Sequence, residues 1–397
     1  MKILFWLNIG FDRGGPSVHL LQSVISSALK AGHSVDVILK DTGGAEEKMP
    51  SFFSENEAFT YTSVAEIEKG KTGFVKRYLN EISYAVKCRR IFKGKKYDVA
   101  FLQSCNAAAF YVACLRTLKC PIVFNVQDIF PQNLKFSGQL PVAKITYPVF
   151  SRLQKTAYKK ADRLITISED MKDTIAEQGI EREKIEVVYN WSYADDPIRF
   201  ENIPEEQILD LGLDPQKTNV VYAGNIGKMQ NVELIAKTAK LSKNDPTVHY
   251  YIIGDGANKP NVEQITEGLS NVTILPMQPS IYAESIYAQA DVNVIPLAKG
   301  GIKTALPSKT ATILRTDTSA VFCIDRGSKF EEMLKNNKQI RVADNSNPEL
   351  LYQVICELRD DATDTENGEL LQSFSKKNAD RYVEIMADAV EINRAKR

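Results

Sequence analysis

The sequence contains few of the residues that build metal and redox sites. Its 397 residues include three histidines (His19, His33 and His249) and six cysteines, and no two cysteines form a Cys-x-x-Cys pair. An Asp-x-Asp motif is also absent. These absences argue against the common zinc and redox motifs. We therefore expect reduced thiols, no bound metal and no resident cofactor.

Long apolar runs are missing as well. No stretch approaches the roughly 20 apolar residues that cross a bilayer. The apolar segment Met1–Leu7 is interrupted at once by Asn8 and Gly10, so it is too short for a signal peptide and is typical of a first β-strand. Hydrophobic residues make up 44% and charged residues 25% of the chain, the composition of a globular protein. We expect a cytoplasmic one.

Charge is balanced over the whole chain but unevenly distributed. Residues 1–190 hold 27 Lys and Arg against 20 Asp and Glu, an excess of seven positive charges. Residues 191–397 hold 23 against 30, an excess of seven negative charges. This asymmetry predicts different partners for the two halves.

Short apolar runs alternate with helical stripes, the signature of βαβ units and parallel sheets. Strands are predicted at Lys2–Asn8, Ser34–Leu39, Tyr97–Gln103, Pro121–Gln127, Arg163–Ile167, Ile185–Tyr189, Val220–Ala223, Val248–Ile253, Val272–Leu275, Val292–Ile295 and Ala320–Ile324. Helices are predicted at Ser17–Ala31, Phe74–Phe92, Asn106–Leu118, from Ser168, and at Asn231–Leu241, Ile281–Ala290, Ser308–Arg315, Asn347–Arg359 and Leu371–Ala395. The pattern predicts an α/β protein with two Rossmann-like doubly wound domains, residues 1–195 and 196–370, which bind ligands between them, and a last helix within residues 371–397.

Four glycine-containing segments follow predicted strands and are candidates for phosphate binding, because glycine lets backbone N–H groups approach an anion. They contain Gly14 and Gly15; Gly224, Asn225 and Lys228; Gly254 and Gly256; and Lys303, Ser308 and Lys309. The last segment carries two lysines and a predicted helix start, so it gives the strongest indication of a diphosphate site. For each segment, a simple turn or a solvated lysine is the alternative interpretation.

Polar and basic residues of the first half indicate further contacts. Gln127 and Asp128 follow a buried strand, and Asp128 could order an acceptor hydroxyl or cap a turn. Basic residues cluster in two segments, 71–96 and 144–163, the second just after the apolar stretch Phe130–Phe150. This combination fits the surface of an anionic membrane, with a solvated helix face as the alternative. No nucleic-acid motif accompanies the charge.

Together these segments resemble glycosyltransferase family 4, which has the GT-B fold. The resemblance rests on Gly14-Gly15, on the turn Ala31-Gly32-His33-Ser34-Val35 and on the strand Ala161–Ser168. Tyr222–Gly227 and Ala305–Lys309 are similar to a bacterial subgroup that builds O-antigen and capsule, including N-acetylfucosamine transferases.

The resemblance implies retaining, metal-independent transfer of a sugar from a nucleotide sugar, and a last helix that crosses back onto the first domain. We expect the donor to be a UDP-sugar and the acceptor to be a saccharide or polyprenyl-linked sugar at the inner membrane face. We expect catalytic roles for Asp128, Gln127 and Lys303. Diphosphate contacts are expected from Gly14, Gly15, Lys228, Lys303, Ser308 and Lys309, and nucleotide contacts from Gly224, Asn225, Gly254, Gly256, Pro276, Met277 and Thr312.

The chain departs from the family pattern near the donor. Thr304 and Thr312 stand where the family has two glutamates, Asn225 and Gln230 stand where it has Arg and Lys, and Gln127 replaces a histidine. Two alternatives therefore stay open. One is a catalytically degenerate partner of another transferase, and the other is a nucleotide-sugar epimerase, which would need acidic or histidine side chains that this sequence has in small number.

Overall fold

The computed structural model describes residues 1–11, 16–41, 49–65, 74–133, 140–193, 195–316, 318–360 and 368–396. The chain divides into two compact units. Unit 1 comprises the described residues up to Tyr193 together with those from Lys376 onward, and unit 2 comprises the described residues between them.

Unit 1 is built on a seven-stranded parallel sheet with the order β3-β2-β1-β4-β5-β6-β7. Its strands are β1 (Lys2–Trp6), β2 (Ser34–Asp41), β3 (Phe59–Ala65), β4 (Val99–Gln103), β5 (Ile122–Val126), β6 (Arg163–Thr166) and β7 (Ile185–Val187). Six of these strands were predicted and are confirmed. The edge strand β3 was missed, because its sequence Phe-Thr-Tyr-Thr-Ser-Val-Ala is half polar and only partly buried.

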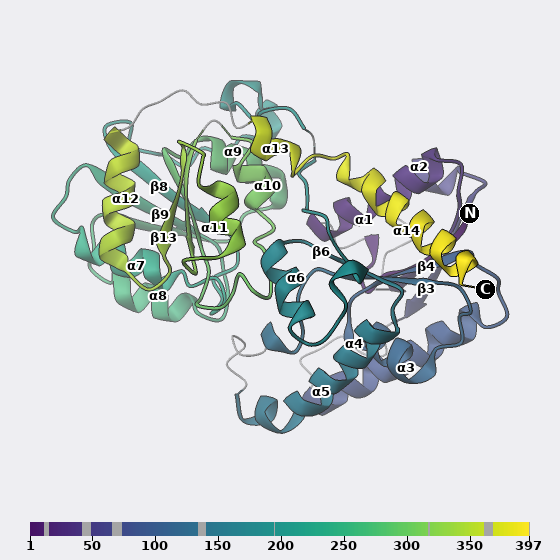
Figure 1. The fold of residues 1–397 in the computed structure, drawn as a ribbon. Coiled ribbons are helices and arrows are strands. Elements are labelled where there is room, and N and C mark those ends of the chain that lie inside the picture. The colour runs from purple at the N-terminus through teal and green to yellow at the C-terminus, as the bar shows by residue number, and fades with distance from the viewer. Residues whose placement is uncertain are drawn as a thin grey trace. The chain divides into compact units, whose positions relative to one another are not determined.

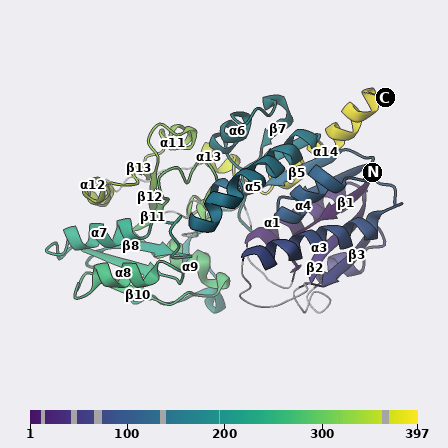
Figure 2. The same cartoon turned by 90° about the horizontal axis from the view of Figure 1, so that it is seen from below.

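Helices cover both faces of this sheet. They are α1 (Pro16–Lys30), α2 (Ser51–Ser54), α3 (Phe74–Phe92), α4 (Asn106–Phe110), α5 (Leu140–Lys160), α6 (Glu169–Ala176) and α14 (Asn378–Ala395). Figures 1 and 2 show α1 and α14 on one face and α3, α4 and α5 on the other. The last helix packs into the core of unit 1, where Tyr382 and Met386 join apolar residues of α1, β1 and β4. The expected return of this helix is thus confirmed.

Two helices of unit 1 differ from expectation. Residues 106–118 were predicted to form one helix. In the structure, α4 ends at Phe110, and a wider π-helical turn, η2 (Tyr111–Leu115), follows it directly. Helix α5 was missed, since Pro148 lies inside it and proline normally ends a helix. The cap predicted at Ser168 is confirmed: its hydroxyl accepts the Met171 N–H at 3.2 Å.

Unit 2 has a six-stranded parallel sheet with the order β10-β9-β8-β11-β12-β13. Its strands are β8 (Thr218–Ala223), β9 (Val248–Ile253), β10 (Val272–Leu275), β11 (Val292–Pro296), β12 (Ser319–Ile324) and β13 (Ile340–Asp344). The first five were predicted, and the edge strand β13 was not. Each unit therefore has the doubly wound plan that the sequence predicts.

The helices of unit 2 are α7 (Glu233–Leu241), α8 (Lys259–Thr266), α9 (Ala283–Ala288), α10 (Thr310–Ile313), α11 (Lys329–Leu334), α12 (Pro348–Asp360) and α13 (Gly368–Gln372). Figure 1 shows α7, α8 and α12 on one face of the sheet and α9, α10 and α11 on the other. Two predictions were wrong. The helix expected at 308–315 is the single turn α10, and the long last helix is divided into α13 and α14.

No helix among the described residues is both long and apolar enough to cross a membrane.

Candidate functional site

The carboxyl ends of β8 and β9 carry two glycine loops that pack directly on each other. The backbone at Gly254 has φ near +156°, and a Cβ there would lie 1.9 Å from the Gly224 carbonyl oxygen. At Gly256 a Cβ would meet the Ile226 carbonyl oxygen at 2.5 Å. The Ile226 N–H donates to the Asp255 carbonyl at 2.7 Å and locks the loops together. These glycines are therefore required by loop packing, whatever they contribute to nucleotide binding.

Lys309 reaches into the end of β8. Its Nζ donates to the Ala223 carbonyl at 2.8 Å and lies 3.7 Å from the centre of the Tyr222 ring, a cation–π contact. The hydroxyl of Tyr287 donates to the same carbonyl at 3.2 Å. The residue is half-buried, but its ammonium group is enclosed, and this desolvation lowers the pKa of Lys309 to about 7.

This placement makes the charge of Lys309 depend on whether an anion is bound beside it. Without a ligand, the amine is partly neutral near pH 7, because the contacts that replace its water are one carbonyl oxygen and one aromatic ring. An anion beside it would favour the charged form and raise the pKa. The backbone of Gly224 lies next to the Lys309 side chain: a Cβ on Gly224 would lie 3.2 Å from the Lys309 nitrogen. The site thus places a side chain that an anion can protonate directly beside the backbone of Gly224.

Lys228, Lys303 and Ser308 are exposed and lie in the neighbouring loops. The two loops touch, because the Ala298 N–H donates to the Met229 carbonyl at 2.8 Å. The glycine turn that precedes Lys303 is fixed by Asp325, whose two carboxylate oxygens accept the Gly300 N–H at 2.9 and 2.8 Å. The structure therefore gathers the loops that carry the three predicted lysines at one edge of the sheet.

The helix expected to begin at Ser308 contributes less than predicted. Because α10 has only four residues, it has little macrodipole. The Thr310 N–H is already bonded to the Pro307 carbonyl at 3.0 Å. Pro276 and Met277 are exposed directly after β10, beside the Gly254 loop, whose N–H donates to the Leu275 carbonyl at 3.0 Å.

In unit 1, polar side chains gather at the carboxyl end of β5. Gln127 donates to the Asn125 side chain at 3.0 Å and to the Tyr382 hydroxyl at 3.4 Å, and it accepts from Asn190 at 2.8 Å. Gln127, Asn125 and Tyr382 line a small pocket with Gln103 and Trp191. The sequence pointed to Gln127 but missed Tyr382, which is indistinguishable there from an ordinary apolar-face residue of the last helix.

Asp128 and the loop before α1 complete the list of expected residues in unit 1. Asp128 is exposed, and the pKa of its carboxyl is raised by the desolvation that nearby protein imposes. Its exposure limits that rise. Gly14 and Gly15 lie outside the described residues.

A histidine that sequence reasoning passed over lies on α1. The His19 ring stacks on Tyr193, with centroids 4.2 Å apart, and meets the Trp191 ring edge-on at 6.5 Å. Burial lowers the pKa of His19 and so favours the neutral form of its ring. Only its position in the first turns of α1, after the glycine loop, could have indicated it.

Two family models match this chain. Residues 13–191 match the model Glycosyltransferase Family 4, and residues 217–361 match the model Glycosyl transferases group 1. Each match falls on one of the two sheets. The chain belongs to the glycosyltransferases.

Curated relatives of this glycosyltransferase are distant. WbjE of Pseudomonas aeruginosa, named a glycosyltransferase, is 25% identical over 216 residues, 53% of this chain and 53% of the relative. WcaI of Escherichia coli strain K12, whose name refers to glycosyl transfer in colanic acid biosynthesis, is 22% identical over 234 residues, 57% of this chain and 56% of the relative. The chain thus matches about half the length of these curated relatives.

Solved structures share the whole fold. The lipopolysaccharide outer core galactosyltransferase WaaB aligns with TM-score 0.63 and 12% identity over 98% of this chain and 99% of its own. HepE of Anabaena in complex with UDP aligns with TM-score 0.61 and 14% identity, over 100% of this chain and 98% of its own. Starch Synthase IV of Arabidopsis thaliana, bound to ADP and acarbose, gives 0.67 and 12%, over 98% and 99%. The glycosyltransferase has the GT-B fold.

The glycosyltransferase has neutral groups where the family pattern has charges. Thr304 is buried, and its hydroxyl donates to the Gly301 carbonyl at 3.1 Å. Thr312 is half-buried on α10. Asn225 donates to the Gln230 side chain at 3.0 Å, so these two amides form a pair in the loop after β8. Lysines at this edge of the sheet include Lys228, Lys303 and Lys309, together with exposed Lys299 of the loop after β11.

Proposed function

We propose that the protein transfers a sugar from a nucleotide diphosphate donor to a saccharide or lipid-linked acceptor during synthesis of a bacterial surface polysaccharide. The family membership supports the reaction class. The name of WcaI supports the biosynthetic context, since it refers to colanic acid biosynthesis. HepE, which binds UDP in its solved complex, supports a uridine nucleotide. The donor is thus proposed to be a UDP-sugar.

The observation that carries this proposal is the enclosed ammonium of Lys309 at the end of β8. As the bond to the sugar breaks, the leaving diphosphate gains negative charge, and a side chain that is already in position and becomes charged beside the diphosphate stabilises that charge more than the ground state. Lys309 is held by the Ala223 carbonyl and the Tyr222 ring before any ligand arrives. It is therefore the group best suited to this role, with Lys303 and Lys228 as exposed auxiliary cations.

Retention of configuration and independence of metal ions are parts of the same proposal. Both are what the resemblance to family 4 implies. Metal independence is also consistent with the lysines at the sheet edge, which supply the positive charge that a divalent ion supplies elsewhere. Gly224, Gly254, Gly256, Pro276 and Met277 are proposed to contact the nucleotide, mainly through backbone groups, together with Asn225 and Thr312.

The acceptor is proposed to bind unit 1 at the end of β5. Gln127 is oriented by Asn125, Asn190 and Tyr382, and Asp128 is the nearest exposed carboxylate in sequence. We propose that this edge receives the acceptor hydroxyl.

Membrane association at the inner face is proposed from α5. Its exposed Val149 is followed by Arg152, Lys155, Lys159 and Lys160, a combination that suits anionic headgroups.

The test is a thermal-shift comparison of wild type, Lys309→Met and the control Lys335→Met with UDP, GDP, ADP and CMP, without metal, followed by a turnover comparison of the same proteins with UDP-sugars as donors. Lys335 is an exposed lysine of unit 2 that lies outside the donor loops. A ligand present at 100 times its Kd stabilises the folded state by about 2.7 kcal/mol. A UDP-selective shift that Lys309→Met weakens and Lys335→Met preserves would support the proposal. No shift with any nucleotide at millimolar concentration would contradict it.

One observation favours a second candidate, a catalytically degenerate partner of another transferase. Thr304 and Thr312 replace both family carboxylates, and the hydroxyl of Thr304 is already bonded within its own loop. Such a protein would bind UDP but release no sugar, with or without added acceptor. Donor consumption in the same assay would exclude this candidate.

A further inference from the structure

Unit 1 carries a recess at the edge of its sheet opposite to the candidate acceptor residues. It is lined by the α3–β4 turn (93–98), the segment before β5 (117–121) and the last turn of α14 (Val390, Asn393 and Arg394). These residues precede β4 and β5, so they lie at the amino ends of the strands. The volume of the recess is about 580 Å³, within the range of small-molecule pockets.

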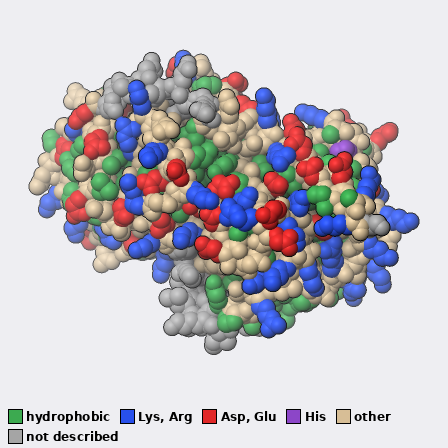
Figure 3. All heavy atoms as spheres, viewed as in Figure 1, with side chains coloured by type: hydrophobic (Ala, Val, Ile, Leu, Met, Phe, Trp, Pro, Cys, Tyr) green, Lys and Arg blue, Asp and Glu red, His purple; other side chains and the backbone are tan. Residues whose placement is uncertain are grey.

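The recess is strongly basic. Its lining holds five cations against one carboxylate; the cations are Lys93, Lys95, Lys96, Lys119 and Arg394, and the carboxylate is Asp98. Figure 3 shows Lys and Arg gathered where α3 and the C-terminus meet the surface.

The nearby carboxylates are already engaged. Asp98 accepts the Lys2 N–H at 2.7 Å. Buried Asp36 pairs with Lys95 at 3.0 Å and accepts the Tyr97 hydroxyl.

Three of the cations have no counter-charge. Within the described residues, the side chains of Lys93, Lys96 and Arg394 form no hydrogen bond or ion pair. Arg394 also lies in the last turn of α14, where the negative end of the helix favours it. Three like charges around one recess repel each other, and an anion of matching charge removes that repulsion.

Part of the lining of the recess is apolar and buried. Phe92, Leu118, Cys120 and Val390 are buried there, and Pro121 begins the approach to β5. A low-dielectric lining strengthens the attraction between the surrounding cations and a bound anion. The concave form, with cations on its walls, suits a compact soluble anion better than the flat surface of a bilayer.

We propose that this recess binds a soluble phosphate-bearing anion of two or more negative charges, such as a diphosphate, at a site separate from the sugar donor. The chemistry that recognises it is ammonium and guanidinium contact with phosphate oxygens. The site does not depend on the proposed transferase activity, because none of its residues lies in the loops after β5, β8 or β9. An occupant here would be a regulator of the enzyme or a second ligand.

The experiment is hydrogen exchange of the full chain, read by peptide, with and without inorganic pyrophosphate. Isothermal titration calorimetry of the full chain with inorganic pyrophosphate supplies the affinity. The variant Lys93→Ala/Lys96→Ala/Arg394→Ala removes three exposed cations, and the control Lys240→Ala/Lys243→Ala/Lys335→Ala removes three exposed lysines from unit 2. We expect pyrophosphate to protect peptides within 93–98 and 117–121. The first variant should abolish this protection and weaken the corresponding binding by about tenfold or more, and the control should not.

Two outcomes would overturn the proposal: no protection of these peptides by pyrophosphate, or protection that the triple variant retains. Vesicles of phosphatidylglycerol and of phosphatidylcholine form a separate arm. Protection that only the anionic vesicles give would assign the surface to a lipid headgroup and refute a soluble ligand. Protection by pyrophosphate that is confined to peptides 224–230 would show binding at the donor site alone. It would refute a ligand in the recess and leave the proposed function standing, so the two failures are distinguishable.

Discussion

Nucleotide binding by unit 2 should take up a proton, and Lys309 should be the group that receives it. In the free protein, desolvation lowers the pKa of Lys309 from 10.5 to about 7. A diphosphate beside the ammonium stabilises its charged form and returns the pKa toward its ordinary value. Between these two pKa values the free amine is mostly neutral and the liganded amine mostly charged, so binding and protonation are linked.

The magnitude follows from the two pKa values. At pH 8 a group of pKa about 7 is about 0.1 protonated, and one of pKa about 10 is almost fully protonated, so binding should take up about 0.9 proton. Isothermal titration calorimetry measures this number directly. The apparent enthalpy of UDP binding is recorded in phosphate, HEPES and Tris, whose ionisation enthalpies differ, and the slope against ionisation enthalpy is the proton uptake.

Lys309→Met is the decisive variant, with Lys335→Met as the control. Methionine keeps the length and the apolar part of the side chain but binds no proton. Wild type and control should give the same slope at pH 8, and Lys309→Met should give a slope near zero with weaker UDP binding. The reasoning is refuted if the wild type takes up no proton, or if Lys309→Met takes up as much.

The same variant tests the cost of burying the amine. The unfolded chain binds more protons than the folded chain between pH 7 and 10.5, so the free energy of unfolding should rise with pH in that window. At about 1.4 kcal/mol for each tenfold change in proton affinity, the cost at lower pH is at most about 5 kcal/mol. The lost hydrogen bond and ring contact offset part of this. We therefore expect Lys309→Met to be more stable than wild type by about 1–2 kcal/mol at pH 6, a difference that shrinks by pH 10.

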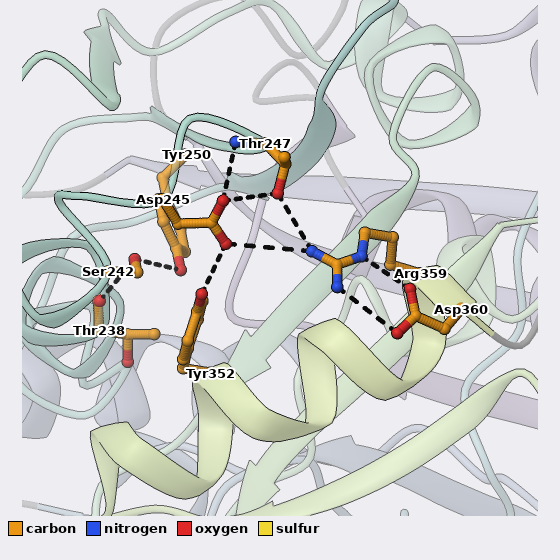
Figure 4. Close-up of polar contacts among 8 residues, drawn as sticks. All are labelled: Thr238, Ser242, Asp245, Thr247, Tyr250, Tyr352, Arg359 and Asp360. Carbon is orange, nitrogen blue, oxygen red and sulfur yellow. Dashed lines mark hydrogen bonds and ion pairs between the residues drawn. The ribbon is translucent and has the colours of Figure 1, made fainter.

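Three further predictions concern other parts of the fold. Gly254→Ala should lower the free energy of unfolding, measured by urea denaturation, by about 3 kcal/mol or more, because the new Cβ would meet the Gly224 carbonyl oxygen at 1.9 Å. The control Gly268→Ala, at φ +76° with open space around it, should lower it by only about 1 kcal/mol. Equal losses for the two variants would contradict the packing argument. Asp245 accepts the Thr247 N–H and hydroxyl and the Tyr352 hydroxyl (Figure 4), and these bonds lower its pKa. Asp245→Asn should therefore cost about 1 kcal/mol above pH 4, a difference that disappears as pH falls through the lowered pKa; an unchanged difference at pH 2 would count against it. Tyr382→Phe should change the melting temperature by no more than about 2 °C, since the Tyr382 hydroxyl makes two long hydrogen bonds of 3.4 Å to described residues. The variant should nevertheless raise the KM for the acceptor, because Gln127 loses one of its partners. An unaltered KM would remove Tyr382 from the acceptor site.

The regular part of the fold was predictable because buried parallel strands are short and almost wholly apolar. β1, β4, β5, β8, β9, β11 and β12 were all found from such runs. Of the four edge strands, β7 and β10 were found, whereas β3 and β13 were missed, since their polar residues make them resemble loops. Helix α5 was hidden by Pro148, and α10 was overestimated because its helical stripe continues into residues that fold as turns.

The candidate site was predictable in part for a similar reason. Glycines and lysines after strands are visible in the sequence, so Gly224, Gly254 and Lys309 were identified. Their partners were not visible, because the contacts join distant residues: Lys309 with Ala223, and Gln127 with Tyr382, 255 positions apart. Nor could the sequence distinguish the enclosed Lys309 from the exposed Lys303.

That distinction bears on how the site avoids competing anions. An exposed lysine is charged at all physiological pH values and attracts any phosphate. The enclosed Lys309 becomes fully charged only when an anion reaches the end of β8. Part of the binding free energy is therefore used to protonate the amine. Affinity should consequently fall as pH rises from 7 to 10, by at most tenfold for each unit. A diphosphate that did not reach Lys309 would show no such slope, so the pH dependence of binding separates correct from superficial occupation of the site.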